Sequence, residues 1–379
     1  MRDAVIIEAV RSPVGKRDGK LSNTLPVYLS ARILRELVSR AGIEPRLVED
    51  VILGCVTPLG EQGANIARLS VLQAGFPDHI PAVTINRMCG SSQQAIHFAA
   101  QEILSGDMDV VIAGGIEVMS RVPIGADWPK QWPPDFPYPL VHQGISAEMM
   151  AERWKLTREE LDRFAFESHV KAAAATRRGD LSREMVPIPV TLPDGTSETM
   201  TIDEGIRFEP NLDKMGKLQP AFKPDGVITA ANSSQISDGA AAVLLMSADK
   251  ARELRLKPRA RLVARVVVGS DPVVMLAGPI PATRQALDRA GLKLDDIAAV
   301  EINEAFASVV LAWQKEIQPD PARVNPNGGA IALGHPLGAT GAILMTKLLH
   351  HLERTGGRFG LQTMCIGHGM ATATVIERL

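Results

Sequence analysis

A few side chains of this 379-residue chain lie where they could carry out covalent chemistry. Cys89 stands between an apolar run at residues 82–86 and a helical pattern at residues 91–104. Because free N–H groups and the helix dipole favour a thiolate at a helix N-terminus, we expect a lowered pKa for Cys89. A free cysteine is more commonly a buried, inert side chain. This segment alone leaves both interpretations open.

A histidine lies in a glycine-rich segment at residues 328–341. His335 is followed by Pro336, which restricts the histidine backbone to extended conformations. A neutral imidazole that reaches a thiol can act as the base that removes its proton. A phosphate-binding glycine loop is the alternative, but the Lys-Ser/Thr pair of a P-loop is absent.

A second cysteine and an asparagine each follow an apolar strand pattern. Cys365 opens the stretch Cys365-Ile366-Gly367-His368-Gly369. Its thiol could be a general acid or base, and the N–H of Gly367 could bind an oxyanion. We interpret His368 as a neighbour rather than a participant. Asn303 fits either a helix cap or an amide that orients a water or an oxyanion.

The segments that must position these residues alternate between strand and helix patterns. This alternation predicts an α/β fold with a largely parallel sheet covered by helices. Residues 128–134 contain three prolines, so we expect no regular structure there. The strand patterns are at residues 4–8, 51–54, 82–86, 110–115, 240–245 and 299–302, and the helical ones at 25–41, 91–104 and 146–178.

The two halves of the chain resemble each other. Residues 40–52 align with 289–301, an offset of 249 from Arg40 to Arg289, and two further segments align at offsets of 248 and 251. Three matches in order indicate a duplicated α/β unit, in which equivalent loops can face one cleft. We predict an N-terminal half at 1–118 completed by 232–257, an inserted domain at 119–231, and a C-terminal half at 258–379.

Composition excludes several classes of function. The chain has 45% hydrophobic and 22% charged residues, 4% aromatics and a net charge of −2. These values are ordinary for a globular protein and give no sign of nucleic-acid or anionic-membrane binding. No apolar run reaches the roughly 18 residues of a membrane span. The three cysteines have no metal-ligand spacing and cannot all pair, which favours a reducing compartment, and we expect a cytoplasmic protein.

Taken together, the motifs resemble those of the thiolase family, whose members make or cleave 3-ketoacyl-CoA. The resemblance covers essentially the whole chain and implies a duplicated, five-layered αβαβα fold with a loop domain inserted in its N-terminal half. It also implies that no cofactor is needed, because coenzyme A is a substrate. The motifs are Asn86-Arg87-Met88-Cys89-Gly90-Ser91, Asn303-Glu304-Ala305-Phe306, Gly334-His335-Pro336 and Cys365-x-Gly367-x-Gly369.

The resemblance assigns a role to each reactive residue. Cys89 attacks the carbonyl and carries the acyl group, while His335 activates Cys89 and helps to bind the thioester oxygen. Asn303 holds a water in that same oxyanion hole. Cys365 moves the proton of the acetyl α-carbon or of the incoming thiol. The N–H groups of Cys89 and Gly367 form the second oxyanion hole of a ping-pong reaction.

Coenzyme A contacts carry over in the same way. Arg207 matches the basic residue near the adenine and phosphates, and Lys214 is either a further phosphate contact or a solvated lysine. Phe222, Phe306 and Met275 could also be ordinary core residues. The resemblance places Phe222, Ala230 and Ser234 along the pantetheine and His142, Met275 and Phe306 near the reactive end.

Two departures from the family pattern border the acyl pocket. Short-chain biosynthetic members tend to have methionine where this chain has Gln143, and glycine where it has Leu276. We therefore expect a degradative 3-ketoacyl-CoA thiolase acting in fatty acid β-oxidation, with a biosynthetic acetoacetyl-CoA-forming acetyltransferase as the alternative. The resemblance also implies a homodimer or homotetramer, and admits a β-oxidation partner subunit.

Other classes of protein fit the residues less well. A 3-ketoacyl synthase lacks the second cysteine of the Cys-x-Gly-x-Gly loop, so Cys365 argues against it. A Cys-His-Asn hydrolase would leave the inserted region unexplained, and no protease-like signature surrounds Cys89. A non-catalytic CoA-binding subunit would be expected to have lost at least one reactive residue, and all four are present.

Overall fold

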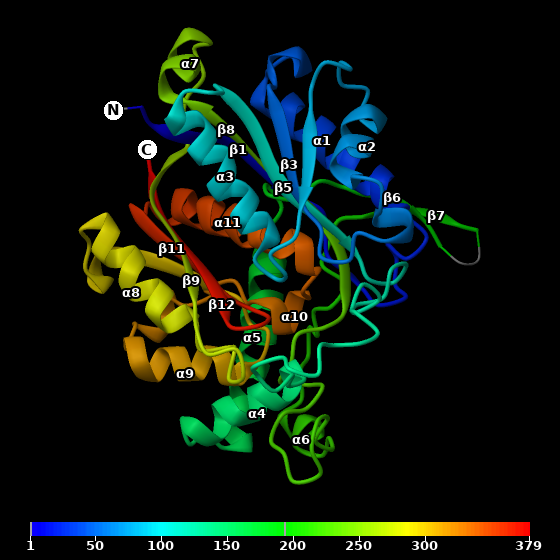
Figure 1. Ribbon diagram of the computed structural model, residues 1–379, viewed down its shortest axis with the longest axis vertical. Coiled ribbons are helices and arrows are strands. Elements are labelled where there is room, and N and C mark those ends of the chain that lie inside the picture. The colour runs from blue at the N-terminus through cyan, green and yellow to red at the C-terminus, as the bar shows by residue number, and fades with distance from the viewer. Residues whose placement is uncertain (1, 193–194) are drawn as a thin grey trace.

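The computed structural model describes residues 2–192 and 195–379 as one large sheet with helices on both sides (Figure 1). The strand order is β10-β11-β12-β9-β1-β8-β5-β3-β4, with β2 (Gly15–Lys16) paired to β8. β6 (Ile188–Thr191) and β7 (Ser197–Met200) form a separate hairpin. The other strands are β1 (Ala4–Arg11), β3 (Asp50–Gly54), β4 (Ala82–Ile85), β5 (Val110–Val118), β8 (Ser237–Ser247), β9 (Ala260–Gly269), β10 (Ile297–Ile302), β11 (Phe359–Ile366) and β12 (Met370–Arg378).

The strand order confirms the predicted duplication. The arrangement β3-β5-β8-β1 of the first half recurs as β10-β11-β12-β9 in the second, with the same directions. The two halves join where β1 pairs with β9, through Val5 with Arg261 and Ile6 with Ala260. The domain boundaries given above stay a prediction.

The expectation of a largely parallel sheet was wrong. Only β3 with β4, β3 with β5, and β10 with β11 run parallel, and the remaining pairs are antiparallel. The last strand of each half, β8 or β12, returns beside its predecessor in the opposite direction. β12 follows β11 after only three residues, too few for a parallel crossover.

The two halves of the sheet and the helices form five layers, in the order helix, strand, helix, strand, helix. α1 (Pro26–Ala41) and α2 (Ile66–Gln73) cover the first half of the sheet, and α8 (Pro279–Ala290) and α9 (Ala307–Ile317) cover the second. Figure 1 shows α3 (Ser91–Ser105) and α11 (Leu337–Thr355) together between the two halves. Fifteen of the nineteen residues of α11 are buried, so its polar side chains need partners inside the protein.

Two local features hold α11 close to the sheet. A Cβ atom on Gly115 of β5 would come within 2.0 Å of the carbonyl oxygen of Gly338 on α11. Lys347 of α11 is fully buried and donates to the Glu301 carboxylate at 2.8 Å and to the carbonyl of Gly328 at 2.6 Å. The ion pair connects α11 to β10, and the hydrogen bond to Gly328 connects it to the loop that leads to His335.

The predicted helix over residues 146–178 is two helices, α4 (Gln143–Arg153) and α5 (Arg158–Arg178). The chain breaks at Lys155, which has a left-handed φ of 52°. Thr157 then starts α5 with a capping box to Glu160. α4 and α5 both pack on α9, so this part of the chain is attached to the second half of the protein.

Residues 128–134 have no regular structure, as their prolines predicted, and the whole region between residues 119 and 142 contains no helix or strand. The remaining short helices are α6 (Leu212–Gly216), α7 (Ala248–Glu253) and α10 (Ala330–Leu333), and α10 packs on α5. Among the described residues, no helix has the length and apolar character that crossing a bilayer requires.

Candidate active site

Cys89 lies in a tight turn before α3. Met88 has a left-handed φ of 46°, and its N–H donates to the Asn86 side chain at 2.8 Å. A Cβ atom on Gly90 would come within 2.3 Å of Ile366, so glycine lets the end of β11 approach. The turn thereby places Cys89 of the first half beside the strand that carries Cys365 of the second.

Burial dominates the ionisation of Cys89. It raises the pKa of the thiol to about 11, although the N–H groups of Gly367 and Cys89 and the side-chain amide of Gln143 hydrogen-bond to the sulfur and oppose the rise. The expected lowering of this pKa was therefore wrong, because a pattern of residues shows a helix start but not the loss of water around the sulfur. In the resting protein Cys89 is a neutral thiol.

His335 is a neutral imidazole with one nitrogen ready to accept a proton. Burial lowers its pKa to about 4. Its Nδ1 lies 2.7 Å from the Thr340 hydroxyl, which itself donates to the carbonyl of Pro336 at 2.9 Å. The hydroxyl must therefore accept from Nδ1–H, which leaves Nε2 unprotonated. Nε2 faces the Asn303 amide nitrogen at 3.3 Å.

Asn303 does not cap a helix, which corrects that interpretation. The next helix, α9, begins four residues later with Phe306 as its N-cap. The Asn303 side chain instead turns to His335, and its Oδ1 is buried without a hydrogen-bond partner among the described residues. A buried acceptor in this position suits a bound water or a donor on the substrate.

Cys365 is a second neutral thiol close to the first. It is fully buried near the end of β11, opposite Ala371 of β12. Burial and the neighbouring Cys89 both raise its pKa well above the ordinary range. Cys365 is therefore protonated at rest, and its proton is available to a more basic carbon.

A buried carboxylate that sequence reasoning missed ties the loop after β3 to the start of α11. Glu117 accepts hydrogen bonds from the N–H groups of Val56 at 2.8 Å, Thr57 at 3.1 Å and Gly338 at 2.9 Å, and from Gln62 at 2.9 Å. Gly338 is the second residue of α11, directly after the His335 loop. The available signal was one acid inside the otherwise apolar strand β5.

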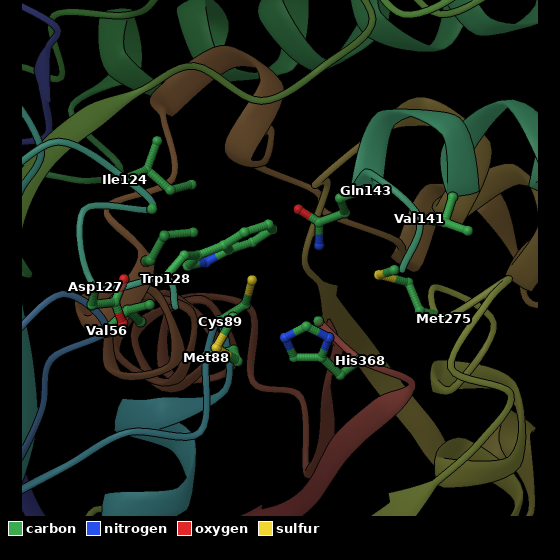
Figure 2. A pocket seen from close by; sticks show the side chains of 13 residues that line it. Val56, Met88, Cys89, Ile124, Asp127, Trp128, Val141, Gln143, Met275 and His368 are labelled. Carbon is green, nitrogen blue, oxygen red and sulfur yellow. The ribbon is translucent and has the colours of Figure 1, made fainter. Parts of the chain in front are cut away.

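Cys89 opens into a small cavity of about 60 Å³, which Figure 2 shows. A larger cavity of about 550 Å³ shares four of its lining residues and is walled mainly by apolar and aromatic side chains from residues 128–142. The two cavities therefore adjoin. The shared residues are Trp128, Val141, Met275 and His368.

The structure brings three of the predicted binding residues into one aromatic cluster. The rings of His142 and Phe222 are 5.3 Å apart, and Phe222 meets Phe306 edge-on at 6.0 Å. His142 also caps α4 by accepting from the N–H of Gly144. Met275 lines both cavities, whereas Leu276 is wholly buried.

The remaining predicted contacts lie further out. Ser234 is half-buried and donates its N–H to the carbonyl of Ala305 at 2.9 Å. Ala230, Arg207 and Lys214 are exposed. No described hydrogen bond or ion pair joins the Arg207 guanidinium to the reactive residues, so its coenzyme A role stays a prediction.

Comparisons with known proteins agree with this arrangement. The chain matches the thiolase N-terminal domain over residues 4–249 and the thiolase C-terminal domain over residues 256–378. It is 51% identical to the steroid 3-ketoacyl-CoA thiolase FadA6 of Mycobacterium tuberculosis, over 100% of this chain and 95% of that protein. It is 44% identical to a 3-ketoacyl-CoA thiolase of Klebsiella pneumoniae, over 100% of both.

A solved structure is similar over the same extent. The acetyl-CoA acetyltransferase of Bacillus anthracis has a TM-score of 0.93 and 40% identity, and the match covers 100% of this chain and 99% of that one. Both halves of the fold and both reactive loops therefore fall within matched regions. The chain belongs to the thiolase family and is an acyltransferase.

Proposed function

We propose that this thiolase works in the degradative direction and cleaves 3-ketoacyl-CoA esters whose acyl groups are much larger than acetyl, including acyl groups that carry rings. The observation that carries the proposal is the pair of adjoining cavities beside Cys89. The larger one, about 550 Å³, lies within the range of roughly 300–1,000 Å³ that holds drug-sized ligands. An acetyl group needs no such space.

The first half-reaction would begin with Cys89 giving its proton to Nε2 of His335. The sulfur attacks the 3-keto carbon, and the N–H groups of Cys89 and Gly367 stabilise the oxygen that becomes negative. The bond between carbons 2 and 3 then breaks. The acyl group stays on the sulfur, and the electron pair leaves with acetyl-CoA as an enolate, which takes a proton on carbon from Cys365.

The second half-reaction would return every proton. The thiol of a new coenzyme A gives its proton to the Cys365 thiolate and attacks the acyl-cysteine carbonyl. The shortened acyl-CoA leaves, and the Cys89 sulfur regains its proton from His335. The neutral state of both thiols and of His335 at rest supports this sequence, because charge then develops only while substrate is bound.

The size of the acyl group separates the proposal from its rival, an acetoacetyl-CoA-forming acetyltransferase. The similarity to FadA6, whose name specifies steroid 3-ketoacyl-CoA, supports ring-bearing substrates. The test is coenzyme A-dependent cleavage of 3-ketoacyl-CoA esters from four carbons to long and cyclohexyl-bearing chains. We expect higher kcat/KM beyond four carbons. Activity confined to acetoacetyl-CoA would refute the proposal.

An acylation assay distinguishes the roles of the two thiols. Cys89→Ala should prevent formation of an acyl-enzyme, measured as intact protein mass after incubation with acetyl-CoA. Cys365→Ala should still be acylated but should lose cleavage and condensation. An adduct on the Cys89→Ala protein would disprove the nucleophile, and equal loss of both steps in Cys365→Ala would make Cys365 structural.

We also propose that the chain forms a homodimer through the open edge of the sheet at β4. The opposite edge, β10, is covered, because Asn325 donates its N–H to Val300 and accepts from Ile302. β4 is the other end of the sheet. Exposed apolar side chains lie on β4 and on α2 beside it, and they are Val83, Leu69 and Leu72.

An open strand edge with apolar neighbours favours association with a second copy. Sedimentation of the native protein tests this and separates the dimer from the tetramer that the family resemblance also implies. Val83→Lys with Leu72→Glu should shift the protein to monomer, and a native monomer would refute the proposal. The three free cysteines support a reducing, cytoplasmic location.

A further inference from the structure

His368 is held at the tip of a hairpin in an unusual backbone conformation. It is the middle residue of Gly367–Gly369, the three residues that join β11 to β12. Its φ is 62°, in the left-handed region, and the following Gly369 has a φ of 76°. Side chains other than glycine rarely adopt this conformation, although histidine does so more than most. Such residues gather at functional sites, so the placement of this ring needs a reason.

The ring stands at the boundary between the two cavities. His368 lines both the small cavity beside Cys89 and the larger aromatic one. Figure 2 shows its ring, the Cys89 thiol and the Gln143 amide facing the same space. The rings of Trp128 and Trp132 lie 6.3 and 6.4 Å from it at tilted angles, so His368 is not stacked on either.

His368 also keeps its hydrogen-bonding capacity free. Neither ring nitrogen bonds to another described residue, whereas His335 and His142 both do. The wall around it is otherwise mostly apolar, and includes Phe136, Leu140 and Pro272. His368 is exposed, so water can satisfy the imidazole, but a bound acyl group that displaces this water must replace its hydrogen bond.

We propose that His368 is a specificity-determining residue, which hydrogen-bonds an oxygen on a ring-bearing acyl group close to the reacting carbonyl. The position follows from Gly367, whose N–H would hold the acyl carbonyl oxygen and which is adjacent in the chain, about 3.8 Å away between Cα atoms. The oxygen that His368 contacts therefore lies within a few bonds of that carbonyl. The inference rests on the proposed function, since it assumes that the acyl group enters this cavity.

The test compares matched substrates that differ only in that oxygen. The 3-keto carbon bears a cyclohexyl ring in one ester, and a 3-oxocyclohexyl or 4-oxocyclohexyl ring in the others. One neutral hydrogen bond predicts that the native enzyme prefers at least one oxo ester by about two- to tenfold in kcat/KM. His368→Phe keeps an aromatic ring, and His368→Gly fits the left-handed backbone without strain. Both variants should bring the ratio of kcat/KM between the oxo ester and the plain ester to about one.

His368→Asn provides the matched control, because asparagine tolerates the left-handed conformation and keeps a donor. It should retain part of the preference, which a purely structural role for His368 would not predict. Equal use of the plain ester and both oxo esters by the native enzyme would overturn the inference. A preference that survives in both His368→Phe and His368→Gly would also overturn it.

The linear 3-ketodecanoyl-CoA ester distinguishes this failure from failure of the proposed function. If only acetoacetyl-CoA is cleaved, the proposed function is wrong and the role of His368 is wrong with it. If the 3-ketodecanoyl ester and the cyclohexyl esters are cleaved, and the oxo esters are not preferred over the plain cyclohexyl ester, the proposed function stands and only the role of His368 is refuted.

Discussion

The hydrogen bond from Gln143 to Cys89 leads to a quantitative prediction about the nucleophile. The pKa of Cys89 is raised to about 11, so at pH 7 about one thiol in ten thousand is ionised in the free protein. Replacement of Gln143 by methionine keeps a side chain of similar length but removes the N–H donor. One of the three hydrogen bonds to the sulfur is then lost.

The size of the effect follows from the strength of that bond. A hydrogen bond to a charged group contributes about 1.5–3 kcal/mol, which raises the thiol pKa by about one to two. The thiolate population then falls about 10- to 100-fold. A more basic thiolate is also more nucleophilic, with a Brønsted coefficient of about 0.4–0.5. The alkylation rate should therefore fall roughly three- to tenfold at every pH.

The assay is alkylation of the free enzyme by iodoacetamide between about pH 6.5 and 9.5, with Cys89 followed by peptide mass. The alkylation rate of the native enzyme should rise about tenfold for each pH unit, without a plateau. In a plot of the logarithm of this rate against pH, Gln143→Met should give a parallel line at lower rates. Ile124→Leu changes the same cavity without a donor and controls for access. A native plateau below about pH 8.5 would refute the raised pKa, and coincident lines would refute the role of Gln143.

Three further predictions concern the surrounding residues. Glu117→Gln should lower the free energy of unfolding by about 2–4 kcal/mol, measured by urea denaturation, because N–H groups that face the carboxylate lose their acceptor. Lys347→Met should cost about 3–5 kcal/mol by leaving Glu301 buried and unpaired, and Glu301→Gln added to it should recover most of this loss. Because burial lowers the pKa of His335 to about 4, kcat/KM should fall only as the pH drops towards that value and His335 becomes protonated. An acid limb near the ordinary histidine pKa of about 6.5 would contradict the last prediction.

Much of the fold could be predicted from the chain because apolar periodicity reports local structure directly. The expected helix at residues 25–41 is α1, with Pro26 at its first position and a left-handed Gly42 at its end. Strand direction was predicted wrongly, because a buried strand reads the same whichever way it runs. The break at Lys155 was missed because helical residues continue on both sides of it.

The position of the reactive residues in the fold was predictable, and their electrostatics were not. Cys89 and His335 were placed correctly before two helices that pack together. The pKa of Cys89 depends on how much water the rest of the fold removes, which no local pattern contains. His368 was interpreted as a neighbour, and its left-handed turn and its position between two cavities could not be predicted because distant segments contribute the cavity walls.

Cys89 and His335 lie just before buried helices, whereas the larger cavity is walled mostly by a loop, and this separation affects how substrate specificity can change. The reactive loops precede helices α3 and α11, which pack against each other. The Lys347 ion pair and the hydrogen bond from Gly338 to Glu117 hold α11 in place. The larger cavity is walled mostly by residues 128–142, which contain no strand and no helix before α4. Replacing this loop by a different one should therefore change the substrate specificity while the reactive residues keep their positions.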